Sequence, residues 1–280
     1  MTEFEDRIAG HPTIRFGEGD QRLVIIPGLS DALQSEETSR FTRALLERYY
    51  MRAFADDYAV YIVSRPRELS DDVTTRELAD GYASVLEEIG TADVLGMSMG
   101  GLIAQYLGSD DPENVRNLIV SLAGPHLSES GVNHVTAWLN SAREGRWSEV
   151  YLGSIEATYS SAGTRAAYGS LLRLPGVVKQ PPYPTDFIAS AQACLDYDST
   201  RVLSSIEPNT LVLGGELDVL FDADDLRAME EEIPNATTQI LKDTGHGAFE
   251  EQRKEFARAR IFEHSITEVK PSCADSPGLW

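Results

Sequence analysis

Apolar positions along the chain follow two patterns that alternate over much of its length. Short apolar runs, typical of strands buried on both faces, lie at residues 23–26, 59–63, 94–95, 115–122 and 210–213. We also expect an edge strand at 13–16 and a last strand at 237–241. Helical spacing of apolar residues predicts helices at 35–53, 74–89 and 249–262, and another after residue 100. This alternation predicts an α/β fold, doubly wound, with a mostly parallel sheet covered by helices on both faces.

The alternation fails between residues 124 and 205, after the sixth strand. Only helical patterns occur there, interrupted at Pro175-Gly176 and again at 180–182. Large aromatic side chains supply much of the buried area of a small helical layer, so we expect Trp138 and Trp147 to serve in packing. Cys194 lies within an apolar run and is expected to be a small core residue.

Charge narrows the range of partners. The 280 residues include 45 acidic and 24 basic side chains, a formal net charge of −21, and four of the basic ones are lysines. Such a surface repels phosphate backbones and anionic membranes, so nucleic acid is a poor candidate partner. Two interpretations stay open, an ordinary soluble acidic enzyme and a protein adapted to high salt, where mobile ions screen the repulsion.

Length and apolar content limit the architecture and the compartment. A 42% hydrophobic chain of this size fits one α/β domain that carries an insertion. The sequence has no run of about 18 apolar residues, which predicts no membrane span. Its first residues, MTEFEDRIAG, lack the basic start and apolar core of a secretory signal, so we expect a cytoplasmic protein. Cys194 and Cys273 do not form a disulfide framework.

The most informative motif is G-x-S-x-G at residues 96–100, which follows a short apolar run and precedes a helical pattern. A serine on such a strand-to-helix turn has a strained backbone, and its glycine neighbours are needed because a Cβ would collide with the adjoining strand or helix. This motif resembles the nucleophile elbow of the α/β-hydrolase family, and Gly101 extends it to the form common there. The resemblance implies that Ser98 is the nucleophile.

The same resemblance implies the two partners of the serine. Asp218 follows the strand at 210–213 in a G-x-x-D arrangement and matches the acid, whereas the nearby acids fall where a helix should begin and are typical of its first turn: Asp222, Asp224 and Asp225. His246 lies on the loop after the last strand and matches the catalytic histidine, with Glu250 following it. The order Ser98, Asp218, His246 is that of this fold.

The resemblance also implies an oxyanion hole, formed by the backbone N–H groups of Leu29 and Met99. Here Pro27 stands where the family often has histidine, and Arg65-Pro66-Arg67 stands where it often has a glycine-rich turn. Among the remaining histidines, His126 is expected to reach the mouth of the site. The others are expected at the surface: His11, His134 and His264.

Together these features predict a serine hydrolase that cleaves a carboxylic ester of a small molecule through an acyl-enzyme on Ser98, with no metal and no organic cofactor. The expected parts are a core at 1–123 and 206–264, a helical cap at 124–205 and a tail at 265–280. Lactone or carbon–carbon bond hydrolysis, acyl transfer and cofactor-free peroxidation share the same triad and stay open. So do the oligomeric state and a ligand-binding receptor on the same fold that does not turn over its ligand.

Overall fold

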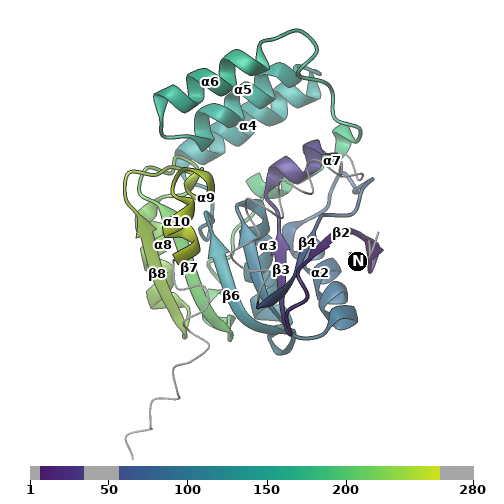
Figure 1. Ribbon diagram of the computed structural model, residues 1–280, viewed down its shortest axis with the longest axis vertical. Helices are drawn as coiled ribbons and strands as arrows, with labels where there is room; N and C mark the ends of the chain where they lie inside the picture. The colour runs from purple at the N-terminus through teal and green to yellow at the C-terminus, as the bar shows by residue number, and fades with distance from the viewer. Residues whose placement is uncertain (1–6, 35–56, 259–280) are drawn as a thin grey trace, which may run out of the picture.

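The computed structural model describes residues 7–34 and 57–258, which form one sheet with helices on both sides and a helical layer above it (Figure 1). The helix predicted at 35–53 and the tail at 265–280 lie outside the described residues. In order across the sheet, the eight strands are β1 (Arg7–Ile8), β2 (His11–Phe16), β4 (Tyr58–Val63), β3 (Gln21–Ile26), β5 (Ala92–Met97), β6 (Val115–Ser121), β7 (Asn209–Gly215) and β8 (Ala236–Leu241).

The strand directions confirm a mostly parallel sheet. The six strands from β4 to β8 along the sheet pair in parallel, and β1 and β2 add an antiparallel edge. The chain leaves β3 toward β4 on one side and later returns to β5 on the other. A doubly wound sheet opens a crevice at such a switch point, at the carboxyl ends of the two diverging strands.

Each central strand is buried on both faces, as its continuous apolar run predicts. In β3, Leu23 and Ile25 face one core, and Val24 and Ile26 face the other. The first core includes side chains of the short helices α9 (Ala248–Glu251) and α10 (Arg253–Arg258). The second is formed with α2 (Thr75–Ile89), α3 (Met99–Asp110) and α8 (Ala223–Glu232).

Helix α2 begins where the predicted helix does because Thr74 and Glu77 form a capping box. The Thr74 hydroxyl accepts the Glu77 N–H at 3.2 Å, and the Glu77 carboxylate accepts the Thr74 N–H at 2.8 Å. The prediction of a single helix at 249–262 is wrong within the described residues, where two short helices occur. Gln252 leaves the helical conformation and donates from its side chain to the Lys242 carbonyl at 2.7 Å, so α9 and α10 are separate.

Four α-helices lie between β6 and β7: α4 (Glu129–Arg143), α5 (Trp147–Thr158), α6 (Ala162–Leu172) and α7 (Pro184–Leu195). Figure 1 shows α4, α5 and α6 as a layer above the ends of the strands. Trp147 is buried there and packs edge-to-face on Phe187 of α7, with ring centroids 5.9 Å apart. Cys194 is buried, as predicted, and burial raises the pKa of its thiol to about 12.

The expectation that His11 lies at the surface is wrong. Its side chain packs against Tyr82 of α2, its Nδ1 lies 3.0 Å from the Ser64 carbonyl, and the residue is only 3% exposed. Burial lowers the pKa of His11. Within residues 7–34 and 57–258, no helix has the length and apolar character that crossing a membrane requires.

Candidate active site

The turn between β5 and α3 holds Ser98 in a strained conformation, with φ 53° and ψ −122°. The residues two positions before and two positions after it must be glycine for steric reasons. A Cβ on Gly96 would lie 2.3 Å from the Gly100 carbonyl oxygen, and one on Gly100 would lie 2.0 Å from the Ile26 carbonyl oxygen. The Ser98 N–H donates to the Ser121 carbonyl of β6 at 2.8 Å. Tight packing of strand, turn and helix therefore fixes this serine.

Three side chains that are distant in the sequence form one hydrogen-bonded line at the carboxyl edge of the sheet. His246 Nε2 lies 2.8 Å from Ser98 Oγ, and His246 Nδ1 lies 2.8 Å from Asp218 Oδ2. With the Nδ1–H donated to the carboxylate, Nε2 is free to accept the serine hydroxyl proton. The structure thus brings together the three residues for which the sequence analysis predicts the roles of nucleophile, acid and base.

Backbone groups hold the Asp218 carboxylate in place. Its side chain has no exposed surface, and its Oδ1 accepts the N–H groups of Leu220 at 2.8 Å and Phe221 at 3.4 Å. The Phe221 ring stacks on the His246 imidazole with centroids 5.9 Å apart. A carboxylate anchored in this way can orient the imidazole and stabilise its protonated form.

The three acids considered as alternatives to Asp218 do not contact His246 in the structure described. Asp222 precedes α8 as its N-cap residue, Asp224 pairs with Arg227 at 2.6 Å, and Asp225 lies 3.9 Å from His126. Their positions are those expected of acids in the first turn of a helix. His126 therefore lies beside α8, and it does not line the cavity described below.

Two backbone N–H groups adjoin Ser98. Leu29 is the first residue of the 3₁₀ helix η1 (Leu29–Leu33), and Met99 is the first residue of α3, so neither N–H has an acceptor within its own helix. The loops that carry them follow the neighbouring strands β3 and β5, and a Cβ on Gly28 would lie 3.2 Å from the Ser98 Cβ. This arrangement suits an oxyanion at the switch point of the sheet.

A cavity of about 220 Å³ opens beside Ser98 and His246, between the sheet edge and the helical layer. Trp138 lines it besides packing in the core, a second role that the sequence analysis missed. No sequence pattern indicates this role, because it depends on the close packing of α4 on α5, where a Cβ on Gly153 would lie 2.6 Å from Trp138 Nε1. Most of the lining is apolar, including Leu33, Met97, Leu122, Val150, Phe187 and Leu220.

Apart from His246, the ionisable side chain that lines this cavity is Glu250. Its Oε2 accepts the Tyr159 hydroxyl at 2.5 Å, and burial together with this carboxylate raises the pKa of Tyr159. No group of three or more histidine, cysteine, aspartate or glutamate side chains with the arrangement of a metal site occurs in the part of the chain that the structure describes.

Comparison with known proteins identifies the class. The model of the alpha/beta hydrolase family matches residues 23–259, most of the chain, so the chain belongs to this family. The fold class and the hydrolase class that the sequence predicts are thereby confirmed.

The individual proteins that resemble this chain have low sequence identity to it. The pimeloyl-[acyl-carrier protein] methyl ester esterase of Vibrio parahaemolyticus is 25% identical over 214 residues, which cover 74% of this chain and 84% of that protein. Two solved structures share the fold. The alpha/beta hydrolase MGS-M2 from a Medee basin deep-sea metagenome library has a TM-score of 0.74 at 16% identity, covering 94% of this chain and 97% of its own. An esterase from Exiguobacterium antarcticum has a TM-score of 0.69 at 21% identity, covering 89% and 92%.

Proposed function

We propose that this protein is a serine esterase that hydrolyses a carboxylic ester through an acyl-enzyme on Ser98. The single observation that supports the proposal most strongly is the line of two 2.8 Å hydrogen bonds from Asp218 through His246 to Ser98. The Vibrio relative and the structural neighbour from Exiguobacterium antarcticum are both esterases, which also supports this proposal. A receptor that binds without turnover has no need for a serine aligned with a base in this way.

The proposed reaction has two halves, acylation of Ser98 and its deacylation, and His246 transfers protons in both. His246 Nε2 takes the hydroxyl proton while Ser98 Oγ attacks the ester carbonyl carbon, and Asp218 stabilises the imidazolium. The N–H groups of Leu29 and Met99 donate to the carbonyl oxygen as it becomes negative. The bond to the leaving alcohol then breaks, and that alcohol takes the proton from His246. A water then attacks the acyl carbonyl carbon while the same imidazole takes one of its protons. The bond from the acyl carbon to Ser98 Oγ breaks, the imidazolium returns the proton to Oγ, and the carboxylic acid leaves.

The substrate class follows from the cavity and the charge around it. An apolar lining favours an apolar acyl group. Glu250 at the cavity and a net charge of −21 disfavour an anionic one. We therefore propose an uncharged ester with an apolar acyl group. In this proposal residues 124–205 are the cap that selects the acyl group, and residues 1–123 and 206–264 are the core.

The test uses p-nitrophenyl esters of increasing acyl length, with wild-type protein and Ser98→Ala. Wild type should turn over the neutral esters and react with a fluorophosphonate probe. Ser98→Ala should do neither, because loss of a triad serine costs about a millionfold in turnover. A matched ester ending in a free carboxylate should react more slowly than its neutral analogue. Equal labelling of both proteins, or a tenth of the turnover in Ser98→Ala, contradicts the proposal.

A further inference from the structure

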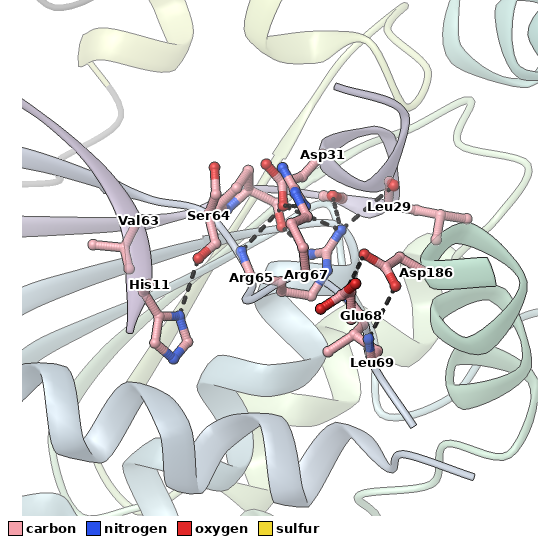
Figure 2. Close-up of polar contacts among 12 residues, drawn as sticks. His11, Leu29, Asp31, Val63, Ser64, Arg65, Arg67, Glu68, Leu69 and Asp186 are labelled. Carbon is pink, nitrogen blue, oxygen red and sulfur yellow. Dashed lines mark hydrogen bonds and ion pairs between the residues drawn. The ribbon is translucent and has the colours of Figure 1, made fainter. Parts of the chain in front are cut away.

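A buried arginine contacts the loop that carries Leu29. Arg65 follows β4 and has no exposed surface. Its Nη1 donates to the Pro27 carbonyl at 3.1 Å, and its Nη2 donates to the Gly28 carbonyl at 2.9 Å and, more weakly, to the Leu29 carbonyl at 3.4 Å. Figure 2 shows the guanidinium beside the chain of this loop. One side chain thus binds three consecutive carbonyl oxygens.

The contact with Gly28 has a direct consequence for Leu29. The Gly28 carbonyl and the Leu29 N–H belong to one peptide unit, which is planar and trans, so the two bonds point in opposite directions. A donor that fixes the carbonyl on one side therefore fixes the direction of the N–H on the other. Hydrogen bonds in series also polarise one another, and a cationic donor on the carbonyl makes the N–H a stronger donor.

The guanidinium is itself held by a buried charge cluster. Asp31 Oδ2 accepts the Arg65 backbone N–H and the Arg67 Nη1–H, each at 3.1 Å, and lies 3.8 Å from Arg65 Nη2. Burial raises the pKa of Asp31, but the two guanidiniums and the hydrogen bonds outweigh burial and hold this pKa below its usual value. Asp31 is therefore charged at neutral pH and keeps both arginines paired.

The segment after Arg65 is fixed from the other side by α7. The buried Asp186 accepts the Glu68 N–H at 3.1 Å and the Leu69 N–H at 2.9 Å (Figure 2). Arg65 thus lies on a segment that Asp31 anchors at the Arg65 backbone N–H and Asp186 anchors at Glu68 and Leu69.

We propose that Arg65 is a positioning residue that aims and polarises the Leu29 N–H of the oxyanion hole, an inference that rests on the esterase proposed above. Arg65 does this without touching the substrate. Arg65 should therefore stabilise the transition state, in which the carbonyl oxygen of the substrate is negative, much more than it stabilises the bound ester.

The experiment compares Arg65→Met with Arg67→Met. Both variants remove a buried guanidinium from the same cluster, but Arg67 contacts Asp31 and none of the three loop carbonyls. For each variant we would measure kcat and KM on a neutral p-nitrophenyl ester, and Ki for an alkyl trifluoromethyl ketone, whose serine adduct carries the oxyanion. Arg65→Lys is the second variant, because it retains the charge but not the fork that reaches several carbonyls.

For Arg65→Met we expect kcat to fall about 30-fold, KM to change less than threefold and Ki to rise by the factor that kcat loses. Arg65→Lys should lose at least fivefold in kcat with the same match to Ki. Arg67→Met should lose stability and stay within threefold of wild type in kcat and Ki. If Arg65→Met does not fold, the kcat and Ki of Arg65→Lys alone test the proposal.

A loss in Arg65→Met no greater than in Arg67→Met overturns the proposal, as does a fall in kcat without a matching rise in Ki. An Arg65→Lys variant within twofold of wild type overturns it too. Failure of the esterase proposal is distinct, because wild type would then be inactive or Ser98→Ala would remain active.

Discussion

The loops after β3 and β5 lie side by side and each offer one N–H at the proposed oxyanion hole, yet they are fixed in different ways. The loop after β5 is shaped by its own glycines, since a Cβ at Gly96 or Gly100 would overlap neighbouring backbone. The loop after β3 is held by Arg65, a side chain 37 residues from Gly28 in sequence. One loop is thus fixed by local packing, whereas the other depends on a distant buried charge in addition to its own turn bond, from the Asp31 N–H to the Gly28 carbonyl at 3.1 Å.

This difference explains how the two loops tolerate change. Backbone packing leaves no room for an added atom, so the loop after β5 should respond to any side chain at its glycines. The loop after β3 should respond to changes in charge and hydrogen bonding in a cluster that does not touch the substrate. The effects of variants in either loop on kcat and stability can be compared with those of variants that change neither loop.

Removing the acid leaves both loops intact and should lower kcat more than a change in either loop does. Asp218→Asn is expected to lower kcat about 10⁴-fold, because an amide favours the wrong imidazole tautomer and cannot stabilise the imidazolium. Steady-state assays with the neutral ester, together with a thermal melt, measure this. Asp222→Asn is the matched control and should stay within about twofold of wild type. If Asp222→Asn proves the more damaging change, the acid is misassigned.

A methyl group in the loop after β5 should come next. In Gly100→Ala the new Cβ would lie 2.0 Å from the Ile26 carbonyl oxygen, so the turn must move and Ser98 with it. We expect kcat to fall at least about 100-fold, with a lower melting temperature. Gly163→Ala in α6, where the nearest atom is 3.7 Å away, should keep full activity. Equal activity of the two variants would show that the glycine is not needed.

The loop after β3 should show a pH-dependent stability effect. Asp31→Asn leaves two buried guanidiniums without their carboxylate, which costs about 3–5 kcal/mol of unfolding free energy at pH 7. The Asp31 pKa is lowered in the folded state, so its contribution is present above the unfolded pKa near 4 and is lost as pH falls through the folded value. Urea unfolding at pH 7, 5 and 3 should show the gap between variant and wild type narrowing only below pH 4. A constant gap down to pH 3 argues against a charged Asp31.

The same contrast explains what the sequence could predict. Ser98 and its glycines are neighbours, and the strand pattern places Asp218 and His246 at the same edge of the sheet, so the family motifs indicate the candidate triad. Pairing of Arg65 with Asp31 depends on how β3 and β4 align, and no local pattern encodes it.

Two further features depend in the same way on contacts between distant segments. His11 is buried against Tyr82 of α2, and the break at Gln252 accompanies its bond to Lys242. Neither contact has a sequence signal near its own residue.

Salt should have the smallest effect on stability, because it screens surface charges and does not act on the loops after β3 and β5. With a net charge of −21, surface carboxylates repel one another, and the screening length falls from about 10 Å at 0.1 M to about 3 Å at 1 M. If the composition reflects high-salt adaptation, the melting temperature should rise by several degrees between 0.1 and 2 M KCl while kcat is retained. KCl is preferred to sulfate, which also strengthens apolar burial. A flat or falling melting temperature rejects that adaptation.

The central claim is that Ser98 carries an acyl group during turnover. Rapid mixing of enzyme with excess p-nitrophenyl ester, followed by an acid quench and mass spectrometry, tests it directly. The account predicts a burst of about one p-nitrophenol per active site whenever deacylation is the slower step, and an added acyl mass on the peptide that contains Ser98. His246→Ala should show neither within the burst period. An acyl mass on a different residue, or steady turnover with hydroxylamine present and no acyl hydroxamate formed, would contradict the claim.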